Sequence, residues 1–430
     1  MSDSCKPIVS APERQGIPFA VLAAALLSVC GGAVAQPSLT LKDGTVYNRP
    51  VYFVGNDKLE VAVVKQGGSM LRILIQGDSQ GLSPYGNPEM VPSVPDNRKL
   101  QGAMVGHFVC VDGFGDPSRE ERAAGLAMHG EAYLQPWKLE GSDKQGATTT
   151  VKFSADLPLR EEHFTRVLRM VDGESVIYVD SELESKTAFD RTANWGEHPF
   201  LYPPFIEREH TVVDMSGTRS QTRTYPASPA GQGGRAAPAG QAAQAGRGGQ
   251  GGRGGRGLSQ GKDFTWPMAP DPDGKPLDLR AAPATGSWMA HTTTLMDPSR
   301  KLAFITVLNT ARHYLLGYVF RREEFPWVQN YLAYTSDWMG RGVEFATQPY
   351  DLPHRDMVEL NRMFDSPVYR WLPAKSKIAT RFILFWVKSP EGMTHVDDVR
   401  LADGKLVVED RAAGKTLTLA ASLPLEATAP

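Results

Sequence analysis

Cysteine is scarce in this sequence, with three residues in 430. Cys5 and Cys30 lie in an N-terminal segment that has the features of a removable signal, so Cys110 alone would remain in the mature chain. A single cysteine excludes an internal disulfide, and stability must come from a large apolar core. Cys110 lies within His107-Phe-Val-Cys-Val111, a strand-like pattern, and we expect it to be a small buried residue rather than a nucleophile.

An excess of either charge is also absent, since 46 Lys and Arg residues accompany 48 Asp and Glu residues. Without a net charge, the chain lacks the general attraction that draws basic proteins to nucleic acids and anionic membranes. The Arg-Gly-Gly repeats of Arg247–Arg256 are of a kind that binds RNA elsewhere, but here no aromatic residues are interleaved with them. We therefore expect a neutral small molecule as partner, and no nucleic acid.

Hydrophobic runs long enough to span a membrane are missing as well. The apolar run Ile17–Val29 is too short to cross about 30 Å of hydrocarbon as a helix. Lys6 and Arg14 precede it and Ala33-Val-Ala35 follows it, which is the order of parts in a secretory signal peptide. The sequence predicts a signal peptide over residues 1–35, cleaved before Gln36.

Export follows from that signal, and two forms of export are open. Cys30 could accept the lipid of a lipoprotein, but Val29 precedes it where a small residue is expected. We therefore predict a protein without a stable membrane anchor, either periplasmic or secreted.

The signatures of common metal and nucleotide sites are lacking too. No H-E-x-x-H or C-x-x-C spacing occurs, and no G-x-x-x-x-G-K-[ST] phosphate loop. The sequence predicts a site that uses neither metal nor cofactor.

Strand-like segments fill the mature sequence. β-Branched and aromatic residues recur with period two, and clusters of Gly, Pro and Asp separate the segments. Long amphipathic helical patterns are not found, so the sequence predicts an all-β fold of antiparallel sheets packed face to face. The predicted strands include Pro50–Val54, Lys58–Val64, Met70–Ile75, Thr149–Phe153, Phe164–Met170, Ser175–Leu183, Leu302–Val307, Tyr314–Phe320, Val328–Tyr334 and Ile378–Val387.

One β-domain is predicted over residues 36–390, with an insertion and a C-terminal tail. The insertion, Ala227–Gly261, is mostly Gly, Ala, Gln, Pro and Arg, and it has too few apolar residues to offset its ordering entropy. We expect it to be a disordered surface loop. Residues 391–430 contain a hairpin pattern, Val399–Asp410, with Asp403-Gly404 as its turn.

Three stretches combine histidine or glutamate with aromatic residues. Gly125–Trp137 contains His129 before a glycine, Asn194–Phe205 contains His198 before a proline, and Arg341–Asp351 contains a glutamate within a strand pattern. Convergence of such groups would give a carboxylate and an imidazole in one site.

In order and spacing these stretches resemble the aldose 1-epimerase, or galactose mutarotase-like, superfamily. The shared features are His-Gly with a Trp some seven residues later, an Asn-x-x-x-His-Pro segment, and a late strand with Glu shortly before Thr-Gln. Gly106–Gly115 resembles the strand and loop that precede the His-Gly motif. The resemblance runs from about Leu39 to Val387, interrupted by the insertion.

The resemblance implies a twisted β-supersandwich that binds a sugar on one concave face. It also implies roles: His129 helps to hold the sugar, His198 is the general acid at the ring oxygen, and Glu344 is the general base at the anomeric hydroxyl. Ring opening of a hemiacetal needs such a pair, because one proton leaves the C1 hydroxyl and another reaches the ring oxygen. The implied function is anomer interconversion of a small carbohydrate.

Further residues near these motifs are predicted to line the sugar site, because Trp and Tyr rings stack on the C–H faces of sugars. They are His107, Asp112, Tyr133, Trp195, Tyr202, Trp327 and Gln348, with the stretch Asp351–Arg355 as a candidate for the rim.

Two features depart from the family pattern. Tyr133 stands where many members have an arginine, and Ala346 stands immediately before Thr-Gln, where many members have the glutamate. Glu344 and Ala346 share one face of the strand but are about 6–7 Å apart. The base is therefore either displaced from the anomeric carbon or brought back by a bulge.

These departures leave alternatives to an aldose 1-epimerase. One is a carbohydrate-binding protein that has the fold without turnover. Another is a lyase or hydrolase of oligosaccharides, since related supersandwiches occur in polysaccharide-degrading enzymes.

Overall fold

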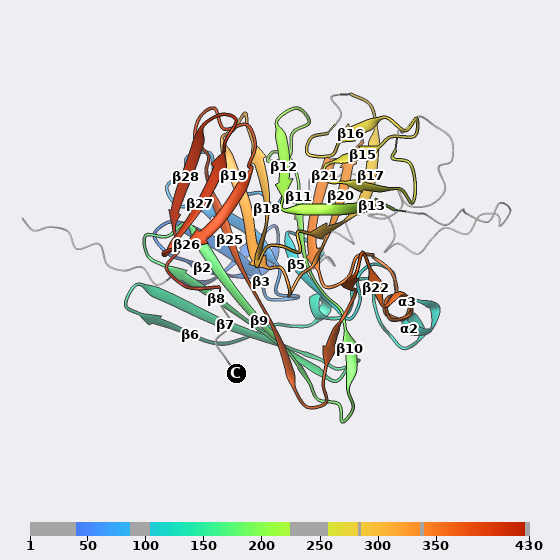
Figure 1. Ribbon diagram of the computed structural model, residues 1–430. Helices are drawn as coiled ribbons and strands as arrows, with labels where there is room; N and C mark the ends of the chain where they lie inside the picture. Colours follow the sequence, from blue (N-terminus) through green and yellow to red (C-terminus); the bar gives the residue numbers. More distant parts are fainter. Residues whose placement is uncertain (1–39, 87–103, 224–256, 283–284, 336–338, 426–430) are drawn as a thin grey trace, which may run out of the picture. The chain divides into compact units, whose positions relative to one another are not determined.

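The computed structural model describes residues 40–86, 104–223, 257–282, 285–335 and 339–425, which all lie in one structural unit (Figure 1). The predicted signal peptide, residues 1–35, lies outside the described residues. So do residues 227–256 of the predicted insertion. Its last five residues are described: Leu258 packs against the main core, and the Ser259 N–H donates to the Pro270 carbonyl oxygen.

The larger of two main sheets has thirteen strands among the described residues. The strand pairings within it, among the described residues, are antiparallel, which agrees with the predicted fold class. In spatial order the strands are β1 (Thr40–Val46), β2 (Arg49–Gly55), β3 (Leu59–Val64), β4 (Met70–Ile75), β5 (His107–Val111), β11 (Trp195–Leu201), β21 (Met339–Ala346), β20 (Trp327–Tyr334), β17 (Trp288–Met296), β13 (Gly217–Thr222), β14 (Asp263–Thr265), β15 (Met268–Pro270) and β16 (Pro276–Asp278).

The second sheet packs against the first and has eight antiparallel strands in the part of the chain that the structure describes. Its long central strands come from both halves of the chain. In order they are β12 (Thr211–Met215), β18 (Leu302–Asn309), β19 (Tyr314–Arg321), β25 (Lys377–Lys388), β9 (Val176–Ser185), β8 (Glu162–Val171), β7 (Thr148–Leu157) and β6 (Lys138–Gln145).

The main core lies between these two sheets. In β8, buried and half-buried residues alternate along the whole strand, as expected where one face packs and the other meets solvent. Phe164 and Leu168 of β8 belong to the same apolar cluster as Val109 of β5 and Phe345 of β21. The period-two pattern of the sequence thus becomes a β-sandwich.

A third layer comes from the end of the chain. The predicted hairpin is present as β26 (Asp398–Ala402) and β27 (Lys405–Asp410), and β28 (Lys415–Ala420) adds a strand to it. This small sheet covers the outer face of β18, β19 and β25 (Figure 1), and Leu406 and Val408 join Phe304 and Phe385 in a second apolar cluster. The covered strands are apolar on both faces for this reason.

Short elements complete the fold. Two-stranded ribbons and short helices connect the sheets, and among the described residues no helix has the length and apolar character needed to cross a membrane. The ribbons are β10 (Arg191–Ala193) with β24 (Arg370–Leu372) and β22 (Arg362–Met363) with β23 (Ser366–Pro367); the helices are α2 (Arg119–Ala123), the 3-10 helix η2 (Ala132–Leu134) and α3 (His354–Leu360).

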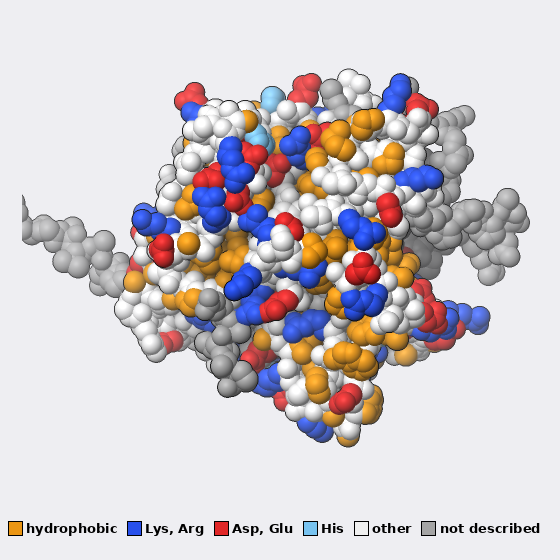
Figure 2. Space-filling view, in the orientation of Figure 1, with side chains coloured by type: hydrophobic (Ala, Val, Ile, Leu, Met, Phe, Trp, Pro, Cys, Tyr) orange, Lys and Arg blue, Asp and Glu red, His pale blue; other side chains and the backbone are white. Residues whose placement is uncertain are grey.

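Charge is mixed over the face seen in Figure 2. Lys and Arg side chains lie among Asp and Glu side chains, in keeping with the near-equal numbers of the two kinds in the sequence. This face offers no broad surface of one sign to a polyanion.

Candidate functional site

Strand β11 sends its side chains to opposite faces of the large sheet. Trp195 and Glu197 point into the main core, where the Glu197 carboxylate pairs with Arg166 of β8. His198 points the other way and stacks against Phe108 of β5. We call the face that bears Phe108 and His198 the site face.

The strand register gathers polar residues into one row on the site face. Phe108 pairs with His198 across β5 and β11, and Glu344 pairs with Gln329 across β21 and β20. Between β11 and β21, the register that pairs Glu197 with Phe345 sets His198 opposite Glu344. Directly opposed residues of neighbouring strands lie within side-chain contact. The row therefore brings together an imidazole, a carboxylate and an amide from distant parts of the chain.

The imidazole of His198 is held between aromatic rings. Phe108 stacks on it with ring centroids 4.3 Å apart, and Phe114 lies at 5.7 Å on a nearly parallel plane. Burial lowers the pKa of His198 well below its usual value, and His129 and His291 add to the shift. The ring is therefore neutral near pH 7.

The carboxylate of Glu344 meets His198 directly. Its Oε1 lies 3.4 Å from His198 Nε2, and both side chains are nearly buried. A Cβ at position 342 would clash with this carboxylate oxygen, so Gly342, on the same face, leaves the space that Glu344 occupies. The glutamate is thus placed beside the histidine without a bulge at Ala346.

His129 reaches the same place from a loop. Its ring centroid is 5.0 Å from that of His198, and its Nδ1 accepts a hydrogen bond from the Gly115 N–H at 3.1 Å. Because Nδ1 accepts, the neutral ring carries its proton on Nε2.

The glycine beside this histidine has a packing reason. His129 and Gly130 both have positive φ, at 64° and 81°. A Cβ at Gly130 would clash with the Val111 carbonyl oxygen, because the loop runs against the end of β5. The His-Gly pair is therefore what lets the loop turn and present the imidazole.

Solved structures show the same architecture. A galactose mutarotase-like protein from Clostridium acetobutylicum superposes with a TM-score of 0.56 at 11% identity, over 81% of this chain and 99% of that one. A proposed aldose 1-epimerase from Klebsiella pneumoniae gives 0.52 at 13%, over 81% and 82%, and a galactose mutarotase related enzyme from Lactobacillus acidophilus gives 0.51 at 11%, over 82% and 100%.

The fold is galactose mutarotase-like. At these identities the comparison shows the fold, which agrees with the resemblance seen in the sequence. No protein-family model matches the sequence, and no curated protein does.

Within this galactose mutarotase-like fold, two of the predicted sugar-lining residues lie on the wrong side of the sheet for contact with the site face. His107 and Trp195 point into the main core, where His107 Nε2 is 2.9 Å from Glu197 Oε2 and Trp195 Nε1 donates to Glu197 Oε1 at 3.2 Å. Burial would raise the pKa of Glu197, but Arg166 and His107 outweigh it and lower that pKa. These residues tie the back of β11 to the second sheet.

Two other predicted residues hold the connections around the site face. Asp112, fully buried, accepts hydrogen bonds from Arg160, Arg191 and the Asn194 N–H. Gln348 accepts from the Asn194 side chain and donates to the Tyr350 carbonyl oxygen. Protein groups occupy the polar atoms of both side chains, so the structure shows them as anchors of loops.

The two predicted tyrosines lie at the edge of the site face. Tyr133 is buried and packs against Phe108, with ring centroids 5.9 Å apart. Tyr202 packs against Phe200, at 4.8 Å, and Phe200 lies 6.1 Å from His198. Both tyrosines therefore border the aromatic rings around His198 rather than His198 itself.

Three polar residues near the site face have no counterpart in the sequence motifs. These are Gln329 of β20, Arg223 after β13, and His291 of β17, which lies 5.5 Å from Tyr331 on the same face. Gln329 had one signal, a polar residue at an alternate position of an apolar strand. Arg223 had none, since it lies outside the motifs, four residues before the Gly/Ala-rich segment begins at Ala227.

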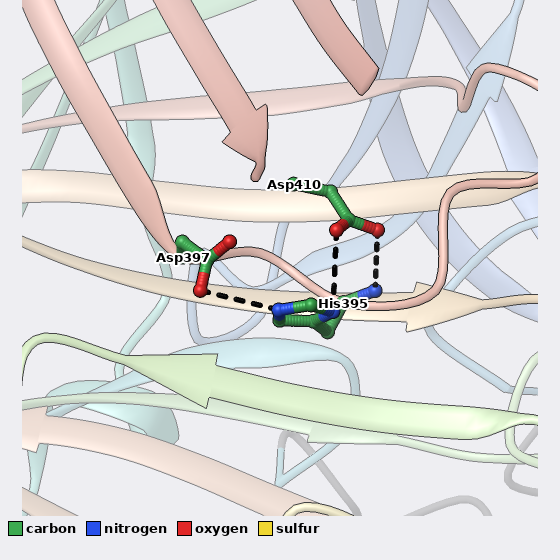
Figure 3. A group of neighbouring side chains, drawn as sticks. All are labelled: His395, Asp397 and Asp410. Atoms are coloured by element: carbon green, nitrogen blue, oxygen red, sulfur yellow. Dashed lines mark hydrogen bonds and ion pairs between the residues drawn. The ribbon is translucent and has the colours of Figure 1, made fainter. Parts of the chain in front are cut away.

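A His-Asp-Asp cluster lies elsewhere, beside the C-terminal sheet (Figure 3). His395 Nε2 is 3.1 Å from Asp397 Oδ1, and His395 Nδ1 is 3.4 Å from Asp410 Oδ1. The carboxylates also accept backbone N–H groups: Asp410 from Thr394 and Ala413, and Asp397 from Arg411. These bonds assign the cluster to fixing the turns around β27.

A pocket of about 1000 Å³ also lies away from these residues, between the C-terminal sheet and the turns of the second sheet. Two of its basic residues form ion pairs: Arg300 pairs with Asp398, and Arg321 pairs with Glu323 and Glu324. None of the predicted site residues lines it.

One match to the serine-hydrolase motif does not have the structure that such an enzyme needs. Gly77–Gly81 matches the G-x-S-x-G pattern, but it forms an exposed turn after β4 rather than a strand-to-helix elbow. Asp78 within it pairs with Lys388 and Tyr314, which makes the turn a contact between the sheets.

Proposed function

We propose that this protein is an aldose 1-epimerase-like enzyme that interconverts the anomers of a small free sugar. The observation that carries the proposal is the 3.4 Å approach of His198 Nε2 to Glu344 Oε1, with His129 beside them, on one face of a galactose mutarotase-like sheet. Core packing alone does not require a carboxylate and two imidazoles to converge.

The proposed chemistry follows from these two groups. Glu344 accepts the proton of the C1 hydroxyl, C1 becomes an aldehyde, and the C1–O bond to the ring oxygen breaks with its electron pair moving to that oxygen. His198 donates a hydrogen bond to the ring oxygen as negative charge develops there. The proton that Glu344 accepted then passes to the ring oxygen, which restores the carboxylate and leaves an open-chain hydroxyl. C1 rotates about the C1–C2 bond, and the reverse steps on the other face of the aldehyde give the other anomer.

The neutral state of His198 suits this role. A neutral imidazole can still donate a hydrogen bond to the ring oxygen. Because it carries no charge, it does not form a strong ion pair that would hold Glu344 away from the sugar. The carboxylate then remains available as the base.

Substrate binding must separate the pair slightly. In the proposed mechanism Glu344 binds the C1 hydroxyl and His198 binds the ring oxygen, each at about 2.8 Å, so the two groups must give up their contact with each other. In the present structure they lie 3.4 Å apart, and rotation of either side chain would free both for the sugar.

Mutarotation followed by polarimetry tests the proposal. We expect His198→Asn and Glu344→Gln each to slow the reaction of the preferred aldose by about 10²-fold or more, because each removes one proton-transfer partner. Sugar binding, measured by calorimetry, should largely persist.

Matched controls separate catalysis from general damage. His163→Asn and Glu60→Gln make the same chemical changes at partly exposed ion pairs away from the site face, and both should keep wild-type rates. Equal rates in the wild type and both site variants would contradict the enzyme proposal.

A binding protein without turnover is the second candidate. It is favoured by Tyr133, which packs its ring into an apolar cluster at the position where many family members offer a guanidinium to the sugar. Sugar affinity that is intact, with no acceleration of mutarotation by the wild type, would establish this candidate.

We also propose that the protein acts outside the cytoplasm, in the periplasm or after secretion. The support is the order of charged, apolar and small residues in the first 35 positions. Free sugars that arrive as mixtures of anomers are a reasonable substrate there.

A further inference from the structure

A closed series of contacts continues from the His198–Glu344 pair around the site face. Glu344 pairs across strands with Gln329, and Gln329 accepts a hydrogen bond from Arg223. Arg223 pairs with Asp351 at 2.8 Å. Asp351 packs against Gly115, where an added Cβ would clash with it, and Gly115 binds His129. The series ends at His198, beside His129, and so encloses the proposed reaction centre.

Arg223 is fixed in orientation by its neighbours. Nη2 donates to Gln329 Oε1, Nη1 faces the Asp351 carboxylate, and the guanidinium lies over the ring of Tyr350 at 4.7 Å. Its Nε is buried and has no hydrogen-bond partner in the part of the chain that the structure describes. A buried donor left without an acceptor is costly, which favours a ligand oxygen as its partner.

The position of the guanidinium fits the far side of a sugar ring. It bonds Gln329, which lies directly opposite Glu344 on the neighbouring strand. Neighbouring strands are about 4.8 Å apart, close to the width of a pyranose ring. A sugar with C1 at Glu344 would therefore place its distal hydroxyls beside Arg223 and Asp351.

The charges of this group disfavour an anionic sugar. Among the described residues of the contact series, Glu344 and Asp351 are acidic and Arg223 is basic, while the histidines carry no charge in the state described above. Arg223 is already neutralised by Asp351, so a carboxylate or phosphate would meet Asp351 and Glu344 without a free cation. Hydroxyl groups can use both partners, accepting from the guanidinium and donating to the carboxylate.

We propose that Arg223, Asp351 and Gln329 form a specificity-determining subsite that selects neutral aldoses and rejects sugars bearing a carboxylate or phosphate. The proposal rests on the proposed function for its placement of C1. It assigns substrate contact to Arg223, which lies outside the histidine and glutamate motifs, and to Asp351, the last residue of the glutamate stretch. Gln329 orients Arg223, because its Oε1 accepts from the guanidinium and its Nε2 donates to the Gln348 carbonyl oxygen.

The test compares matched neutral and acidic sugars. Polarimetry gives kcat/KM for glucose against glucuronate and for galactose against galacturonate, in the wild type and in Asp351→Asn. We expect the wild type to prefer the neutral sugar of each pair, and Asp351→Asn to shift the ratio toward the acid by at least tenfold, because one repelling charge is removed. Asp365→Asn, a fully exposed acid on the β22–β23 turn, should leave the ratio unchanged.

Arg223 gives an independent variant. Arg223→Met should raise KM for the neutral sugar about tenfold and leave kcat within about threefold, since it removes a binding contact and no proton-transfer group. A merely structural role would instead lower kcat and leave the neutral-to-acidic ratio unchanged.

The outcomes separate this proposal from the proposed function. Equal use of neutral and acidic sugars by the wild type, or an equal loss for both in Asp351→Asn, overturns the subsite while mutarotation stands. Where the wild type shows no turnover, calorimetric affinities give the same ratios, so the subsite is judged on binding. Failure to bind any of the four sugars overturns both.

Discussion

The imidazole of His198 lies between the rings of Phe108 and Phe114, where water is largely excluded. A charged imidazole would lose its hydration there, and the nearby rings of His129 and His291 add no compensating negative charge. Glu344 is the acidic group in direct contact with it. The residue therefore acts as a polar but uncharged group in a mostly aromatic environment.

This state predicts an unusual pH profile. Because the pKa of His198 is well below its ordinary value near 6.5, the neutral form persists as pH falls through that value. We expect kcat/KM for mutarotation to stay level from pH 8 to below 6.5 and to fall only at lower pH. Phe108→Ser, which admits water to the ring, should move the fall to higher pH, and Phe108→Leu should not. Activity that appears only on acidification would contradict a neutral His198.

The residues predicted from the sequence were mainly those that acid–base chemistry on a sugar requires. His129, His198 and Glu344 were selected by motif, and the structure brings these three together. Arg223 had no signal in the sequence and Gln329 only one, because their importance comes from the hydrogen bond that joins them across 106 residues of the chain. His107 shows the opposite problem: a histidine in the correct strand faces either side of a sheet with equal ease, and here it faces the core.

Connections between elements depend on a buried ion cluster at the end of β5. Burial would raise the pKa of Asp112, but Arg160 and Arg191 outweigh it and hold the pKa at about 2. Arg191 comes from β10, so the cluster joins the start of the β10–β11 segment to the loop after β5. The loop that carries His129 is built on this junction.

Replacing Asp112 should therefore affect stability more than catalysis. We expect Asp112→Asn to lower the free energy of unfolding by about 3 kcal/mol at pH 7, since the two arginines lose their buried partner. An Asp with a depressed pKa stabilises above its unfolded value near 3.9, and this contribution is lost as pH falls toward about 2. Urea unfolding should show that the difference in free energy of unfolding between variant and wild type is smaller at pH 3 than at pH 7.

The control for this variant is Asp172→Asn, which affects a partly exposed pair with Lys144 and should change stability by less than about 1 kcal/mol. KM for the sugar should change less than about threefold in Asp112→Asn. A tenfold rise in KM, with stability intact, would place Asp112 in contact with the sugar, as the sequence motif first indicated.

Many of the long central strands could be predicted from the sequence, because alternation along a strand is a local property. Others were not predicted, among them β1, β6, β12, β13 and β17. Every predicted strand segment lies within or overlaps a strand of the structure, and Met70–Ile75 has the same bounds. The short strands β14, β15 and β16 were not predicted, since three-residue pairings depend on neighbours rather than on a repeating pattern. The third strand of the C-terminal sheet, β28, was missed for a related reason. Its alternation of apolar and polar residues is weak, and it is held by its pairing with β27.

For the whole molecule, the sequence predicted the class of fold and the structure supplies its layering. A third layer over β18, β19 and β25 explains why these strands lack a polar face. The sequence alone could not say which element would cover them, because apolar runs do not identify their partners.

Export is a prediction about the whole protein. Expressed in a bacterial host with its complete N-terminus, the protein should be recovered outside the cytoplasm with a mass that begins at Gln36. Ala35→Arg should block cleavage at that site, whereas Ser38→Ala, beyond it, should not. An intact Met1, or a mass increase from lipid on Cys30, would contradict the predicted processing.

The sheet order has a consequence for the time at which the proposed site can form. Strand β11 pairs with β5, made much earlier, and with β21, made much later, so neither neighbour is adjacent to it along the chain. Pairings over such separations form slowly, because long loops must close first. Until β21 has been synthesised, His198 lacks Glu344, and β11 has an open edge. A nascent chain with this topology stays unfolded for longer than one built from local hairpins, and an unfolded chain is the form that a narrow export channel can accept.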